Sequence, residues 1–158
     1  MPTHTPTRRT ATPITMGILY ASAWTAATLA NKEKALVMAT RVIDAEYQFS
    51  GVRATATQAL QWPRASVRDP DGEDDLASNA VPVAVRDATG ELARALLIVD
   101  RTAAPAGEGL KYENVGGAQV GYDKSDTRPV IPALVQALLA KYGALINRKS
   151  GAVRLLRV

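Results

Sequence analysis

The chain has 158 residues, a net charge of +4 and an apolar fraction of 47%, which suits one folded domain with a single hydrophobic core. Aromatic residues make up only 5%, and alanine contributes much of the apolar fraction, so packed helices are favoured over a β-sandwich. No run approaches the roughly 18 apolar residues of a membrane span, and the first residues do not resemble a secretory signal. Cysteine is absent, which excludes disulfides and thiolate metal sites and fits assembly in a reducing cytoplasm.

Residues 1–13 predict a flexible arm. They contain three prolines, five threonines and Arg8-Arg9, with almost no apolar side chain to offset the entropy of ordering. We therefore expect one domain over residues 14–158.

The first half of that domain predicts two helices. Residues 14–29 are apolar and alanine-rich, with Tyr20 and Trp24 spaced to share one helical face. A longer helix is expected to begin at an Asn31 N-cap and to stop at Gly51. Its apolar stripe consists of Leu36, Ala39, Ile43 and Tyr47.

Residues 57–62 predict one or two further helical turns, closed by Pro63, because the residue before proline disfavours the helical region. A loop is expected next, since Asp-Pro-Asp-Gly at residues 69–72 is strong turn chemistry.

The second long helix is expected to carry Pro82 in its first turn, with Ser78 or Asn79 as the cap. Its apolar residues recur at alternating steps of three and four and give the strongest helical pattern in the chain: Val85, Ala88, Leu92, Ala95 and Val99.

The last third predicts a β-hairpin over residues 110–122, because two short runs flank the pair Gly116-Gly117. A third helix is expected over residues 133–146, after Pro132, with Leu134, Ala137, Leu138 and Leu145 on its apolar face. Residues 152–158 predict an extended strand. The expected fold class is mainly α, a small helical bundle with one β-hairpin and an extended C-terminal strand.

Catalytic and cofactor chemistry has little support in the sequence. His4 is the only histidine and lies in the arm, which argues against nucleophilic triads and zinc sites. The acidic residues of the loop at 69–75 fail the spacing of a calcium-binding EF-hand and predict a solvated turn. Residues 143–150 miss the phosphate-binding loop pattern, because Arg148 stands where a glycine is required. We expect no enzyme activity, cofactor or metal.

Positive charge collects near the C-terminus, in Lys141, Arg148, Lys149, Arg154 and Arg157, with Tyr142 nearby. Single-strand DNA binders combine a basic groove with stacking aromatic rings. Most aromatic residues of this chain fall where packing is expected, namely Trp24, Tyr47, Phe49 and Trp62. A basic strand that faces solvent or an interface is therefore favoured over a DNA-binding face, which stays as the alternative.

Residues 35–64 carry the pattern "AL..AT..ID..Y…G.RAT..QAL.WPR". This block resembles a family of tailed-phage neck proteins, the head–tail connector adaptors, which also carries the label of DnaT-like single-strand DNA-binding proteins. The likeness continues in the turn at 69–72, in Val81-Pro82 and in residues 87–93, and residues 1–30 depart from it.

The resemblance implies a structural virion protein that forms a ring, usually a dodecamer, beneath the portal protein. Such a ring extends the DNA channel without sequence-specific binding and contacts adjacent subunits and the next neck or tail-terminator protein. It would be assembled in the host cytoplasm and reside in the virion neck, with no membrane contact. The alternative is a DnaT-like single-strand DNA-binding protein in phage replication.

Two sets of site residues follow. Trp62, Pro63 and Arg64 are expected to form a structural turn that organises the bundle, because a buried tryptophan usually anchors packing. The C-terminal strand is expected to dock on the portal or on an adjacent subunit, through Val153, Arg154, Leu155, Leu156, Arg157 and Val158.

Overall fold

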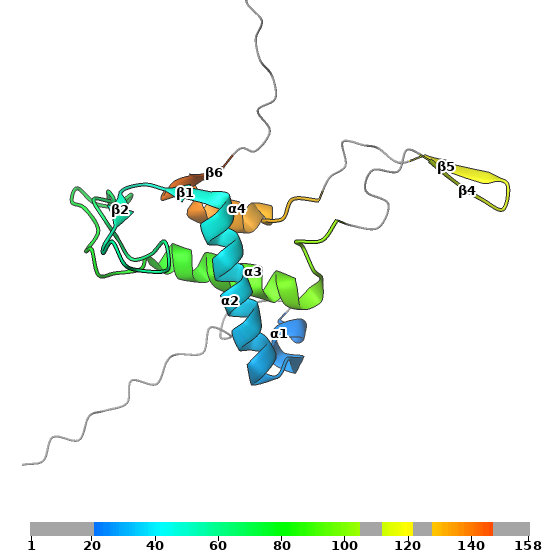
Figure 1. Cartoon of the computed structure of the whole chain (residues 1–158), viewed down its shortest axis with the longest axis horizontal. Helices are drawn as coiled ribbons and strands as arrows, with labels where there is room; N and C mark the ends of the chain where they lie inside the picture. The colour runs from blue at the N-terminus through cyan, green and yellow to red at the C-terminus, as the bar shows by residue number, and fades with distance from the viewer. Residues whose placement is uncertain (1–20, 105–111, 122–127, 147–158) are drawn as a thin grey trace, which may run out of the picture.

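The computed structural model describes residues 21–104, 112–121 and 128–146, and shows a small, mainly α-helical protein (Figure 1). This confirms the expected fold class. The predicted arm, Tyr20 and the predicted strand at 152–158 lie outside the described residues. In chain order, the elements are α1 (Ser22–Ala26), α2 (Leu29–Glu46), β1 (Tyr47–Phe49), β2 (Val52–Arg53), β3 (Arg64–Ala65), α3 (Val83–Ile98), β4 (Tyr112–Val115), β5 (Ala118–Gly121), α4 (Ala133–Leu139) and β6 (Gly143–Leu145).

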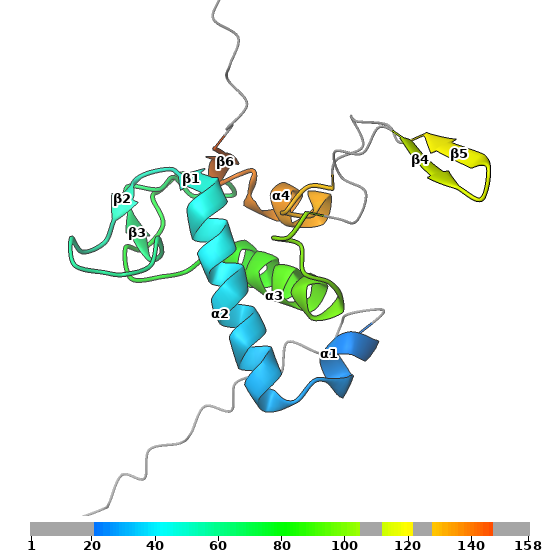
Figure 2. The same ribbon diagram turned by 45° about the vertical axis from the view of Figure 1, so that its right-hand side comes forward.

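The core forms where α2 crosses α3, with α1 and α4 also packed against α3 (Figures 1 and 2). Small residues make up much of the buried surface of the two long helices, including Ala39 on α2 and Ala88 and Ala93 on α3, each with 0% exposure. Small side chains let two helix backbones approach closely. The stripes predicted for both helices are buried at Ala39, Ile43, Ala88 and Leu92.

Helix α2 differs from its predicted bounds at both ends. The N-cap is Thr28, whose hydroxyl accepts the backbone N–H of Asn31 at 3.3 Å, so the prediction of Asn31 as the cap was wrong. The helix ends at Glu46 rather than at Gly51. The next three residues pair antiparallel with β6 and form β1, which places Tyr47 in a strand.

Helix α3 follows Pro82, which occupies the N-cap position without a side-chain cap. The prediction of a cap at Ser78 or Asn79 was therefore wrong. Val99 lies one residue beyond the helix and is 39% exposed, so it does not belong to the buried stripe.

The segment over residues 57–62 is not helical, contrary to the prediction. The Gln58 side chain replaces helical hydrogen bonds there: its Oε1 accepts from Thr55 N–H at 3.0 Å, and its Nε2 donates to the carbonyls of Leu60 (2.8 Å) and Pro63 (2.9 Å). A polar side chain that satisfies the local backbone competes with helix formation. The turn predicted at 69–72 is present, with Gly72 N–H donating to the Asp69 carbonyl at 3.3 Å.

The predicted hairpin is present as β4 and β5, joined by Gly116 and Gly117 with φ of 59° and 88°. Two consecutive positive φ values suit a tight hairpin turn, and glycine adopts them without strain. The hairpin stands away from the helical body in both views (Figures 1 and 2).

Helix α4 begins after Pro132 as predicted but ends at Leu139 instead of Ile146. Its buried residues are Val135 and Leu139, whereas Leu134 is 55% exposed, so the predicted apolar face was wrong. After α4 the chain forms β6, which passes very close to β1. A Cβ on Gly143 would lie 2.5 Å from the Gln48 carbonyl oxygen, so only glycine fits at this contact.

Candidate functional site

The three residues Trp62, Pro63 and Arg64 lie where the loop after β2 returns to the end of α2. Arg64 is 7% exposed, and its guanidinium donates to the carbonyls of Ser50 and Gly51, both at 2.7 Å, and more weakly to Phe49 at 3.3 Å. It also donates to Gln61, at 3.2 Å to the carbonyl and 2.9 Å to the side chain. One side chain thus ties the turn between β1 and β2 to the segment before β3.

Asp44 fixes the same segment from α2. Its Oδ2 accepts the backbone N–H of Gln61 at 3.1 Å. Burial raises the pKa of the Asp44 carboxyl, although the Gln61 hydrogen bond and the charges of Arg53 and Arg64 oppose that shift. Burial also lowers the pKa of Arg64, and the neighbouring Arg53 adds to this effect. No pattern in the sequence indicates the roles of Asp44 and Gln61, because polar residues beside an apolar stripe are common on helices and loops.

Aromatic rings pack in a continuous row beneath this turn. Tyr47 stacks on Phe49 with ring centroids 5.7 Å apart, Phe49 meets Trp62 edge-on at 5.5 Å, and Trp62 meets Tyr142 edge-on at 6.0 Å. All four rings are buried, as is Trp24. Every aromatic side chain whose exposure the structure describes is therefore used in packing, and none is offered to a nucleic-acid base.

Charge is distributed unevenly between the body and the chain ends. The described residues contain 11 basic and 12 acidic side chains, a net charge of −1. The residues outside the described ranges carry the excess of positive charge, with four cations and no acid in residues 147–158. Of the basic residues named with the predicted C-terminal patch, only Lys141 is described, and its Nζ pairs with Asp71 at 2.8 Å. Tyr142, the aromatic residue expected beside that patch, is buried.

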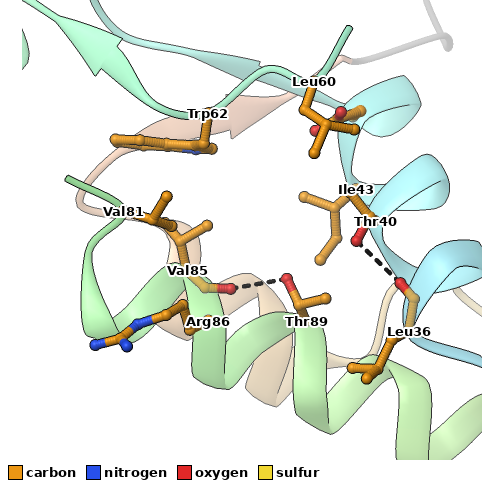
Figure 3. A pocket seen from close by; sticks show the side chains of 10 residues that line it. Leu36, Thr40, Ile43, Leu60, Trp62, Val81, Val85, Arg86 and Thr89 are labelled. Atoms are coloured by element: carbon orange, nitrogen blue, oxygen red, sulfur yellow. Dashed lines mark hydrogen bonds between the residues drawn. The ribbon is translucent and has the colours of Figure 1, made fainter. Parts of the chain in front are cut away.

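An apolar pocket of about 300 Å³ opens beside Trp62, between α2 and the first half of α3 (Figure 3). The hydroxyls of Thr40 and Thr89 donate to the carbonyls of Leu36 and Val85 of their own helices, both at 2.9 Å, so they leave little unsatisfied polarity in the walls. Asp44 supplies a carboxylate. The pocket is lined by Leu36, Thr40, Ile43, Asp44, Leu60, Trp62, Val81, Val85, Arg86 and Thr89.

Large apolar side chains are also exposed on the body. On α2, Leu29 is 73% and Val37 is 53% exposed, and Ile98 at the end of α3 is 62% exposed. A groove between the exposed side of α2 and the end of α3 includes Met38 and Leu97. Isolated exposed apolar residues are normal, but several on adjacent elements indicate a contact surface.

Hydrogen bonds join the end of α3 to the chain that precedes α4. Arg101, just after α3, donates to the carbonyls of Val130 (3.0 Å) and Pro129 (2.8 Å), and Arg128 donates to the Asp100 carbonyl at 2.8 Å. The chain is thereby held together on either side of residues 102–127, the segment that includes the hairpin.

The described ranges offer no further site chemistry. They contain no group of three or more potential metal ligands. No described helix is long and apolar enough to cross a bilayer. His4 and Arg148, on which the arguments about triads and phosphate binding depended, lie outside the described residues.

The fold and surface thus define a small helical domain that carries a hairpin arm. Residues 15–158 match the family described as "Putative DnaT-like ssDNA binding protein", and the chain belongs to that family. This confirms the family label expected from residues 35–64, and the description names the second of the two functions expected from the sequence. No curated protein and no solved structure matches the chain.

Proposed function

We propose that this protein is a head–tail connector adaptor, a structural subunit that forms a ring under the portal of a tailed phage and links the capsid to the tail. The observation that carries the proposal is the hairpin arm of β4 and β5, which stands away from its own helical body. A two-stranded hairpin is marginally stable in water on its own. A neighbouring subunit would supply the missing support, because the outer edges of both strands can accept further main-chain pairing.

The exposed apolar residues of α2 and α3 fit the same role. A ring closes through one heterologous interface repeated by rotation, so each subunit needs two different contact surfaces. The exposed face of α2 and the hairpin arm are two such surfaces on different parts of the molecule. The C-terminal residues Val153 to Val158 would add a third contact, to the portal or to an adjacent subunit.

The charges also suit a DNA channel. A body with a net charge of −1 and buried aromatic rings offers no evident platform for bases in the described residues. DNA would pass through the ring without sequence-specific binding. The expected partners are the portal protein, adjacent subunits in a dodecameric ring, and a downstream neck or tail-terminator protein.

The test is co-sedimentation of the purified protein with portal-bearing capsids, followed by electron microscopy of the portal vertex. The expected result is a ring of added density at the portal. A variant with residues 112–121 replaced by a flexible glycine–serine linker of equal length should keep its helical circular dichroism and lose the ring. Absence of any density with the intact protein would contradict the adaptor role.

A second candidate function is single-strand DNA binding, which the family description and the four cations of residues 147–158 favour. If those four charges contact phosphates, the logarithm of affinity should fall with the logarithm of salt with a slope of about −3. Affinity would then drop by roughly 50-fold between 50 and 200 mM salt. Tight, salt-dependent binding to single-stranded DNA without capsid binding would favour this candidate over the adaptor.

A further inference from the structure

The pocket beside Trp62 has the properties of a binding site that is already formed. Its loop wall, Leu60 to Trp62, is held by three side chains: Asp44 binds Gln61 N–H, Gln58 binds the Leu60 carbonyl, and Arg64 binds Gln61. Leu60 is nevertheless 52% exposed. The backbone of Leu60 is thus held at the edge of an apolar pocket, and its half-exposed side chain is available to cover another apolar group there.

The size of the pocket limits what it can hold. A volume of about 300 Å³ lies at the lower end of the range for small-molecule pockets. It suits one or two aliphatic side chains of a peptide segment. The only carboxylate in its lining is Asp44, and no described residue forms a hydrogen bond to Asp44 Oδ1. A segment with leucine next to a cation therefore matches the walls and the acid together.

We propose that, in the free protein before assembly, the pocket binds the C-terminal segment of the same chain, with Leu155 or Leu156 in the pocket and Arg157 facing Asp44. The sequence Arg-Leu-Leu-Arg at 154–157 places two leucines between two cations. The charge of residues 147–158 is +4, which complements the net charge of −1 of the described body. Arg86 lies on the α3 side of the pocket and would repel a cation there, which favours the α2 side, where Asp44 lies.

The position of the last described residue brings this segment to the pocket. Ile146 N–H donates to the Glu46 carbonyl at 2.7 Å, so the chain leaves β6 beside the end of α2, two residues from Asp44. Trp62, a wall of the pocket, also contacts Tyr142 at the base of β6. The nine residues from Ile146 to Leu155 can span about 30 Å when extended. Binding within one chain also gains from a high effective concentration. The other long segment outside the described residues, 1–20, enters α1 at the opposite end of α2.

Because the chain has no cysteine, a single Val158→Cys substitution allows one nitroxide label to be placed on the full-length protein. Paramagnetic broadening of methyl NMR signals then reports which residues the segment approaches. The expected result is loss of the Ile43 and Val85 signals, which line the pocket, while Ile98 at the far end of α3 is retained. The loss should be unchanged on dilution and absent when labelled protein is mixed with isotope-enriched unlabelled protein.

One matched pair of variants and one double substitution complete the test. Thr89→Phe fills the pocket and should restore the Ile43 signal, whereas Met38→Phe, in the groove on the other side of α2, should not. Because Thr89→Phe could disturb the core, the double substitution of Leu155 and Leu156 by serine removes the occupant without touching the body and should also restore the signal. Equal broadening of Ile43 and Ile98, or broadening that occurs only in the mixed sample, would overturn the proposal. The latter outcome would assign the pocket to a neighbouring copy. The test requires no capsid, so its result is independent of the adaptor role.

Discussion

Replacement of Arg64 by alanine should test whether this side chain holds the turn between β1 and β2. It would remove five hydrogen bonds, two of them 2.7 Å long, from a guanidinium that is 7% exposed. Hydrogen bonds to charged groups contribute about 1.5–3 kcal/mol each, and the two short ones would alone sum to about 3–6 kcal/mol. Ser50 and Gly51 are exposed, so water can hydrogen-bond to their carbonyls and offset part of this free energy. We therefore expect a loss of about 3 kcal/mol in the free energy of unfolding.

The assay is urea unfolding followed by far-UV circular dichroism, with the m-value checked for constancy. Arg64→Lys keeps the charge but not the planar fork of donors, so it should lose roughly half as much stability. The matched control is Arg53→Ala. Arg53 lies opposite Arg64 in the β2–β3 pair, is exposed, and should change stability by less than about 0.5 kcal/mol. If Arg64→Ala were as mild as Arg53→Ala, the turn would not depend on the guanidinium.

Three further predictions concern separate parts of the molecule. Gly143→Ala should cost about 1–3 kcal/mol because its Cβ would push β6 from β1, while Gly121→Ala, with no atom within 4 Å of its Cβ, should be nearly neutral in the same unfolding assay. Asp44→Asn should stabilise the protein at pH 7, because burial raises the pKa of Asp44 and the folded state disfavours its charge. In thermal unfolding at several pH values, this gain in stability should shrink as the pH falls through the folded-state pKa of Asp44, since the wild-type carboxyl is then neutral too. A gain that grew as the pH fell would contradict burial as the cause of the raised pKa. Deletion of residues 152–158 should abolish capsid binding while the helical circular dichroism is retained, and a truncated protein that still assembled would remove the docking role of this segment.

The elements that could be predicted from the sequence are those whose residues follow a single local rule. The three- and four-residue spacing from Val85 to Leu92 places one stripe on α3, whatever the rest of the chain does. Gly116-Gly117 supplies two positive φ angles that other residues resist, so the hairpin was predictable from two residues. Pro132 marked the start of α4 for a similar reason, since proline is tolerated where a helix begins.

Where local rules compete with contacts between distant residues, the distant contacts prevail. Tyr47 continues the helical stripe of α2, but the chain changes to a strand there because β6, almost 100 residues later, pairs with residues 47–49. Residues 57–62 have helical composition, yet Gln58, Asp44 and Arg64 take up their backbone groups. The pocket exists only because that loop is held over α2 and α3. A periodic pattern reports which face of an element is apolar, but a hydrogen bond or strand pair between residues far apart in the chain leaves no such pattern.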